Sequence, residues 1–105
     1  MSQVHDIAKE ARANSERWFP QLHDGHLDLT TFYALGLAGE AGEVCNVVKK
    51  VIRAHDINPS ALLSDLATEM ADVFVYLLLL ADNLGVDLVA EYRAKVVVND
   101  KRWGS

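Results

Sequence analysis

Two pairs of carboxylates are the residues of this sequence best suited to carry out chemistry. Glu40 and Glu43 form the first pair, and Glu69 and Asp72 form the second. Side chains three residues apart on a helix lie on the same side, with Cβ atoms about 5–6 Å apart. Each pair therefore presents two carboxylates together. A single Glu-x-x-Glu on a helix is usually a solvated surface, but here both pairs have mainly apolar neighbours.

The apolar surroundings of the acids indicate a metal site. Asp72 is the one acid in the stretch 70–81, whose apolar residues predict a buried helix. Buried carboxylates are costly unless they are paired or bind a metal. Oxygen ligands suit hard ions such as Mg²⁺ or Mn²⁺. Carboxylate-bridged iron bundles instead need Glu-x-x-His, and no glutamate here has histidine three residues later. Mg²⁺ is therefore favoured, with Mn²⁺ as a substitute.

Four helices are predicted to position these acids, and strand signals are weak. We expect helices at about residues 4–18, 28–54, 59–84 and 87–99, with a loop at 21–28. The start signals are Asp28 and Asn58 followed by Pro59, Gly85 is a helix-ending residue, and the fourth helix is expected to start near Asp87. If the second and third helices pack antiparallel, all four acids meet. Glycines 36, 39 and 42 predict close approach of another helix or of a ligand.

Composition limits the class of protein. A chain of 105 residues predicts a single all-α domain over residues 1–105. Half of the residues are hydrophobic, and packing against a second copy would cover the surplus. The net charge of -5 argues against binding to a nucleic-acid polymer.

The apolar run 73–81 is too short to span a membrane and no signal peptide is visible, so we expect a cytoplasmic protein. The single cysteine, Cys45, is expected to be a small buried residue.

In combination, these motifs resemble the MazG-type all-α nucleotide pyrophosphohydrolases, which include the dCTP pyrophosphatases. The family pattern is Glu-x-x-Glu, a spacer, and then Glu-x-x-Asp, and it matches Glu40, Glu43, Glu69 and Asp72. The similarity extends over roughly residues 28 to 104 and includes a C-terminal Lys-x-x-x-Asn-x-x-Arg-Trp motif beginning at residue 95. The resemblance implies a four-helix bundle-like fold that assembles as a homodimer or homotetramer. This chain has one short domain, in contrast to the tandem members of the family.

The resemblance also implies an activity, the hydrolysis of a (deoxy)nucleoside triphosphate to the monophosphate and pyrophosphate, for control or house-cleaning of the dNTP pool. It implies that the four acids hold Mg²⁺, and Glu40 and Glu43 are the expected catalytic residues. One of the four acids would be the general base, and our hypothesis is Glu43. Phosphate binding is expected from Lys50, Lys95, Asn99 and Arg102, and stacking on the base is expected from Trp18, Phe32 and Tyr76. Two alternatives remain open. One is a related hydrolase of dUTP or phosphoribosyl-ATP, and the other is a non-catalytic helical module that binds a metal or a partner.

Overall fold

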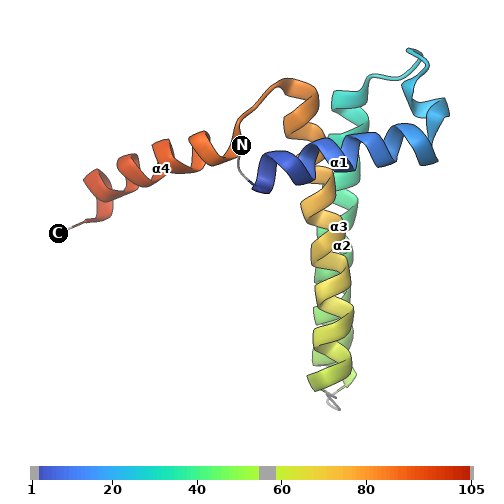
Figure 1. The fold of residues 1–105 in the computed structure, drawn as a ribbon. Coiled ribbons are helices and arrows are strands. Elements are labelled where there is room, and N and C mark those ends of the chain that lie inside the picture. Colours follow the sequence, from blue (N-terminus) through green and yellow to red (C-terminus); the bar gives the residue numbers. More distant parts are fainter. Residues whose placement is uncertain (1–2, 55–58, 105) are drawn as a thin grey trace.

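The structure, a computed structural model, describes residues 3–54 and 59–104 and contains only helices in those ranges (Figure 1). This confirms the all-α prediction. The elements in chain order are α1 (Gln3–Trp18), the short 3₁₀ helix η1 (Pro20–His23), α2 (Leu29–Ala54), α3 (Pro59–Leu84) and α4 (Leu88–Trp103). The predicted loop at 21–28 thus begins with a 3₁₀ turn, because Pro20 ends α1 but is well suited to start a new turn.

The helix ends follow the predicted capping chemistry. The Asp28 carboxylate accepts hydrogen bonds from the backbone N–H groups of Thr30 and Thr31, so it caps α2. Gly85 adopts a φ of +70° just after α3, which is the conformation that favours glycine at this position. Asp87 caps α4 by accepting from the N–H of Ala90 at 3.0 Å. Asn58 lies outside the described residues.

The prediction for the end of α4 was wrong. The helix continues past residue 99 and ends at Trp103, with Gly104 as its cap. No glycine or proline interrupts residues 100–103, so nothing in that stretch stops the helix.

α2 and α3 form an antiparallel hairpin. On each helix, one row of residues faces the other helix. Successive members of the row are alternately three and four positions apart in the sequence, which is the pattern of helices packed in pairs. All members of this row are buried or half-buried. We call the two rows the inner seam: Tyr33, Leu37, Glu40, Val44, Val47 and Val51 on α2, and Leu62, Leu66, Glu69, Val73, Tyr76 and Leu80 on α3.

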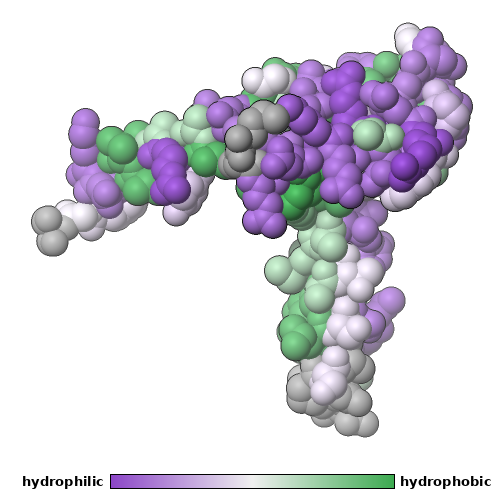
Figure 2. All heavy atoms as spheres, in the orientation of Figure 1, coloured by the Kyte–Doolittle hydropathy of each residue, from purple (hydrophilic) through white to green (hydrophobic). Residues whose placement is uncertain are grey.

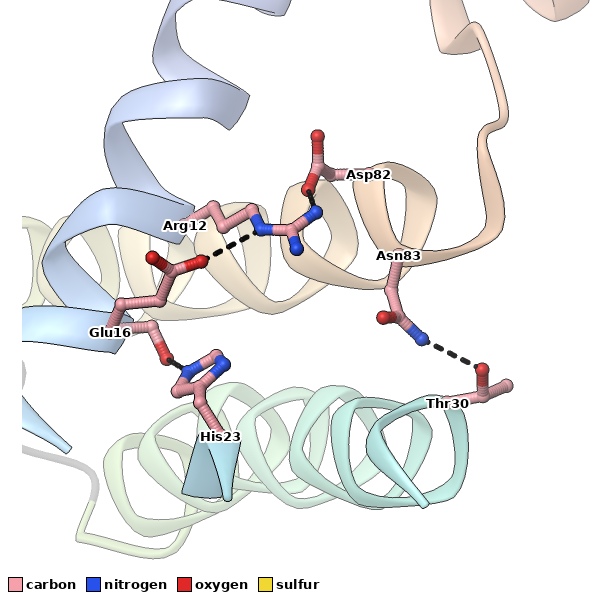
Figure 3. Close-up of polar contacts among 7 residues, drawn as sticks. Arg12, Glu16, His23, Thr30, Asp82 and Asn83 are labelled. Atoms are coloured by element: carbon pink, nitrogen blue, oxygen red, sulfur yellow. Dashed lines mark hydrogen bonds and ion pairs between the residues drawn. The ribbon is translucent and has the colours of Figure 1, made fainter. Parts of the chain in front are cut away.

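α1 crosses the hairpin near the start of α2 and the end of α3, and the best-buried residues gather there (Figure 1). They are Tyr33, Leu78, Leu79 and Ala81, together with the polar Ser15. Hydrogen bonds link the elements at this end (Figure 3): Arg12 donates to Asp82 at 3.2 Å, Ser15 is bonded to His23 at 3.0 Å, and Asn83 donates to Thr30 at 2.9 Å.

α4 extends away from the other helices. The last 23 residues of α3 and the whole of α4 meet at 97°, and α4 points away from the hairpin (Figure 1). One tertiary contact at its start is the 2.9 Å ion pair between the His5 ring and the Asp87 carboxylate. The four helices therefore do not close into a bundle within one chain.

α3 is not covered on all sides, although its apolar sequence predicted a buried helix. Met70 is 60% exposed and Phe74 is 40% exposed, because one chain provides neighbours for only part of the helix surface. In the part of the chain that the structure describes, no single helix is long and apolar enough to cross a bilayer. Only α3 and α4 taken together reach that length and composition, and they are sharply bent at their junction.

Candidate metal and nucleotide site

Three of the four predicted metal ligands come together. A carboxylate oxygen of Glu40 on α2 lies within 4.8 Å of carboxylate oxygens of Glu69 and Asp72 on α3, and the latter two lie within 4.8 Å of each other. Glu40 and Glu69 are half-buried in the inner seam, whereas Asp72 is exposed. The expectation that Asp72 would be buried was wrong, because its side of α3 is open in a single chain. None of the ion pairs in residues 3–54 and 59–104 involves this cluster.

The surroundings of Glu40 shift the pKa of its carboxyl upward. Loss of solvation raises the pKa of its carboxyl, and the negative charges of Asp72 and Glu69 raise it further. A hydrogen bond with Glu69 and the charge of Glu43 act in the same direction. Like charges at this spacing need a proton or a cation between them, and oxygen-only donors are the set that Mg²⁺ and Mn²⁺ prefer. The donor set therefore fits a hard divalent ion.

Glu43 stands apart from the three clustered acids. It lies three residues after Glu40 on α2 and is exposed. Its charge reaches Glu40, since it contributes to the raised pKa there, but its own oxygens are outside the 4.8 Å group. This position is suited to a group that faces a bound water or substrate beside the cluster.

Glu43 and Asp72 lie on the same side of the hairpin. Each immediately precedes a residue of the inner seam, and each helical residue turns by about 100°. Because the two helices are antiparallel, one step back turns to the same side on both. We call this side the acidic face: Phe32, Gly36, Gly39, Glu43, Asn46 and Lys50 on α2, and Asp65, Thr68, Asp72, Val75 and Leu79 on α3. Lys50 is exposed on it, two helical turns beyond Glu43.

A cavity of about 470 Å³ lies between α1, η1 and the hairpin. The three residues predicted to stack on a base, Trp18, Phe32 and Tyr76, all line it. Val75 and Leu79 line it too, so the cavity borders the acidic face. Its volume lies in the range of pockets that hold small organic ligands. The structure thus places a largely aromatic and aliphatic cavity beside the carboxylate cluster.

Tyr76 connects the cavity with the cluster. It follows Asp72 by four residues, which is about one helical turn. Its ring lies directly against the backbone of α2 at Gly36, where an added Cβ would be 2.3 Å from the Tyr76 Cε1 atom. The predicted close approach is therefore found at Gly36. At Gly39 and Gly42 an added Cβ would meet nothing within 4 Å.

The predicted phosphate ligands at the C-terminal end are not brought to the cluster within one chain. Lys95, Asn99 and Arg102 lie on α4, which points away from the hairpin (Figure 1). The Arg102 guanidinium lies 5.0 Å from the centre of the Trp103 ring instead. Of the four predicted phosphate ligands, Lys50 is the one that shares the acidic face.

Two features of the site were not predicted from the sequence. Ser15, only 7% exposed, lines the cavity and is held by its hydrogen bond to His23. The sequence signal for Ser15 is a small hydroxyl residue between the apolar positions of the first helix, which does not by itself indicate a cavity. Cys45, expected to be buried, is exposed on α2.

Comparison with known proteins gives a partial match. No family model matches the chain. A protein named Gene 37 protein from Mycobacterium phage L5 is 40% identical over 57 residues, which are 53% of this chain and 50% of the phage protein. The match thus spans about half the length of that relative, whose name states no activity.

Proposed function

We propose that the acidic face binds Mg²⁺ and hydrolyses a nucleoside triphosphate between its α and β phosphates. The observation that supports this most is the cluster of Glu40, Glu69 and Asp72, which has no cationic partner among the described ion pairs and lies beside an aromatic cavity. A metal beside a nucleoside-sized cavity is the arrangement that a metal-dependent nucleotide hydrolase requires. The family resemblance of the two acid motifs points to the same reaction.

In this proposal Glu40, Glu69 and Asp72 hold the metal, with Glu43 next to them. A bound Mg²⁺ would neutralise phosphate charge and lower the pKa of a coordinated water. Glu43 takes the proton of the attacking water. The water oxygen forms a bond to the α phosphorus, the bond from that phosphorus to the bridging oxygen breaks, and pyrophosphate leaves. Glu40, which lies three residues before Glu43 and clusters with the acids of α3, would hold the metal beside Glu43 and in this way take part in catalysis.

The cavity would hold the nucleoside. Trp18, Phe32 and Tyr76 offer ring faces for stacking on a base, which is favourable for any base. Lys50, which is exposed two helical turns beyond Glu43, would contact the leaving phosphates. Lys95, Asn99 and Arg102 enter the site only in an assembly where α4 of a neighbouring copy reaches the acidic face. The biological role that fits best is adjustment or cleaning of the nucleotide pool.

The decisive experiment is pyrophosphate release from a panel of dNTPs and NTPs with Mg²⁺, extended to dUTP and phosphoribosyl-ATP. We expect release by the wild type and loss of release in Glu43→Ala and Asp72→Asn. Asp65→Asn is the matched control, because Asp65 is an exposed acid of the same face that lies outside the cluster. If the folded wild type releases no pyrophosphate from any member of the panel, the proposed activity is wrong and a binding module becomes the better explanation.

A further inference from the structure

The direction of α4 is set at its first turn. Leu88 and Val89 are half-buried there, whereas every later residue of the helix except Val96 is exposed. Figure 2 shows α4 projecting from the molecule as a separate arm. The helix has 16 residues and is therefore about 24 Å long. A rotation of about 20° at the first turn would move the far end by about 8 Å, so a contact at the start decides where the far end lies.

A side-chain contact between α1 and α4 lies at this first turn. The Nε2 atom of His5, near the start of α1, is 2.9 Å from the Oδ1 atom of Asp87. Asp87 is the N-cap of α4, and the same oxygen accepts the backbone N–H of Ala90 at 3.0 Å. Figure 1 shows the N-terminal end of α1 beside the start of α4. One carboxylate oxygen therefore both caps α4 and ties it to α1.

The protonation of the His5 ring determines the strength of this contact. The N–H of Ala90 and the hydrogen bond with His5 lower the pKa of Asp87, so its carboxyl is ionised at neutral and mildly acidic pH. An ionised carboxylate can only accept hydrogen bonds, so Nε2 must donate. A neutral imidazole ring can donate this hydrogen bond, but an imidazolium adds the attraction of a full positive charge. The contact is therefore stronger when the ring is protonated.

A cavity at the contact leaves room for the first turn of α4 to move. It has a volume of about 260 Å³, and His5 is part of its wall. Val86 and Leu88 line it from the start of α4, opposite Ala8 of α1 and Leu78 of α3. Helices that pack tightly leave few spaces larger than a water molecule. The start of α4 is thus held beside α1 without being closely packed against it.

The other charged groups near His5 keep their places when α4 turns. Lys9 of α1 and Asp82 of α3 line the same cavity. The Asp82 carboxylate is paired with Arg12 of α1 at 3.2 Å. α1 packs across α3, so these groups move together with His5. A movement of α4 therefore changes the charge around His5 through Asp87.

We propose that the contact between His5 and Asp87 is a pH-dependent latch for α4, which holds the helix more tightly when the His5 ring is protonated. The ring is charged at mildly acidic pH, and the latch weakens as the pH rises through the range of about 5 to 8 in which histidine titrates. An exposed ion pair contributes little energy, so we expect the ratio of held to released α4 to fall about two- to five-fold over this range. The latch acts on the helix that carries Lys95, Asn99 and Arg102. It does not depend on the proposed hydrolase activity.

Distances between two spin labels test the latch. One label is placed on the native Cys45 of α2 and the other on the cysteine of a Val98→Cys variant of α4, both at exposed positions. Labelled protein is diluted with an excess of unlabelled protein, so that only distances within one chain are measured. We expect a narrow distance distribution at about pH 5.5 and a broader or shifted one at about pH 8. The same distribution at both pH values would overturn the proposal.

Three variants separate the latch from other effects of pH. Asp87→Asn keeps a good N-cap but removes the charge, and His5→Gln keeps a neutral donor that does not titrate. We expect both to lose the pH response while circular dichroism shows that their helices are retained. His26→Gln is the matched control, because His26 is an exposed histidine that contacts Asp24 in the loop before α2, and it should respond as the wild type does. A response that survives in either of the first two variants, or is lost in the third, would contradict the latch.

Discussion

The contact between Gly36 and Tyr76 allows a sharp test of the structure. Replacing Gly36 with alanine would place a Cβ atom 2.3 Å from Cε1, 2.5 Å from Cδ1 and 2.8 Å from Cζ of the Tyr76 ring. These distances are far below van der Waals contact, and the ring cannot bend. Tyr76 would therefore have to rotate away from α2, out of its place in the cavity wall.

Two opposing effects determine the stability of this variant. Overpacking of a rigid side chain costs about 1–3 kcal/mol. Alanine in place of glycine within a helix stabilises by up to about 1 kcal/mol. Gly42→Ala is the matched control, because Gly42 lies on the same helix and an added Cβ there meets nothing within 4 Å. The stabilisation from replacing glycine with alanine in a helix is the same in both variants and cancels in the comparison. Gly36→Ala is therefore expected to be less stable than Gly42→Ala by about 1–3 kcal/mol.

Thermal unfolding at one fixed protein concentration measures this difference. For a domain of this size, each kcal/mol corresponds to a shift in Tm of about 4–8 °C. We expect Gly42→Ala to melt above the wild type and Gly36→Ala to melt at least about 4 °C below Gly42→Ala. Gly36→Ala should also raise KM for the nucleotide, since Tyr76 is displaced. Equal melting temperatures for the two variants would refute the packing of Tyr76 on Gly36 and with it the shape of the cavity.

Three further predictions concern the acids and the cavity. Mg²⁺ should raise the Tm of the wild type and of Asp65→Asn but not that of Glu69→Gln, because only a ligand of the native state stabilises it; an equal rise in all three would count against the cluster. In metal-free protein, the raised pKa of Glu40 means that the folded state binds a proton more readily than the unfolded state does. The free energy of unfolding should therefore fall as the pH rises above 4.5, which is the ordinary pKa of glutamate. Glu40→Gln should remove this part of the pH dependence in denaturant titrations, and an unchanged slope would contradict it. Trp18→Ala should raise KM with a smaller effect on kcat, as steady-state kinetics would show, and an unchanged KM would remove Trp18 from the nucleotide pocket.

The helices and most of their ends, the C-terminal end of α4 excepted, were predictable because the signals are local. Asp28, Gly85 and Asp87 act through the backbone within a few residues, and their capping roles can be read from their neighbours alone. The meeting of Glu40 with Glu69 and Asp72 followed from one further assumption, the antiparallel packing of α2 and α3. The apolar spacing of both helices made that assumption a reasonable one.

The exposure of Asp72 and Cys45 could not be predicted in the same way. An apolar sequence shows that a surface must be covered, but it does not show whether the cover comes from the same chain. The direction of α4 could not be predicted from the sequence for a related reason. It depends on the turn at Gly85 and on the ion pair between His5 and Asp87, two residues 82 positions apart in the chain.

The arrangement of the hairpin in three adjacent rows has a consequence for how its sequence can change. The acidic face, the inner seam and a third row, made of the residues that directly follow the inner seam, occupy consecutive positions, as in the run Gly39, Glu40, Ala41. Deleting a single residue within α2 would rotate everything beyond it by about 100°, so that Val44 would take the place of Glu43 and Cys45 would turn into the inner seam. Substitutions can therefore accumulate in either helix one position at a time. Changes in length can be tolerated only outside the two helices or as whole heptads matched on both, because seven residues in one helix alone would shift it by about 10 Å along the other.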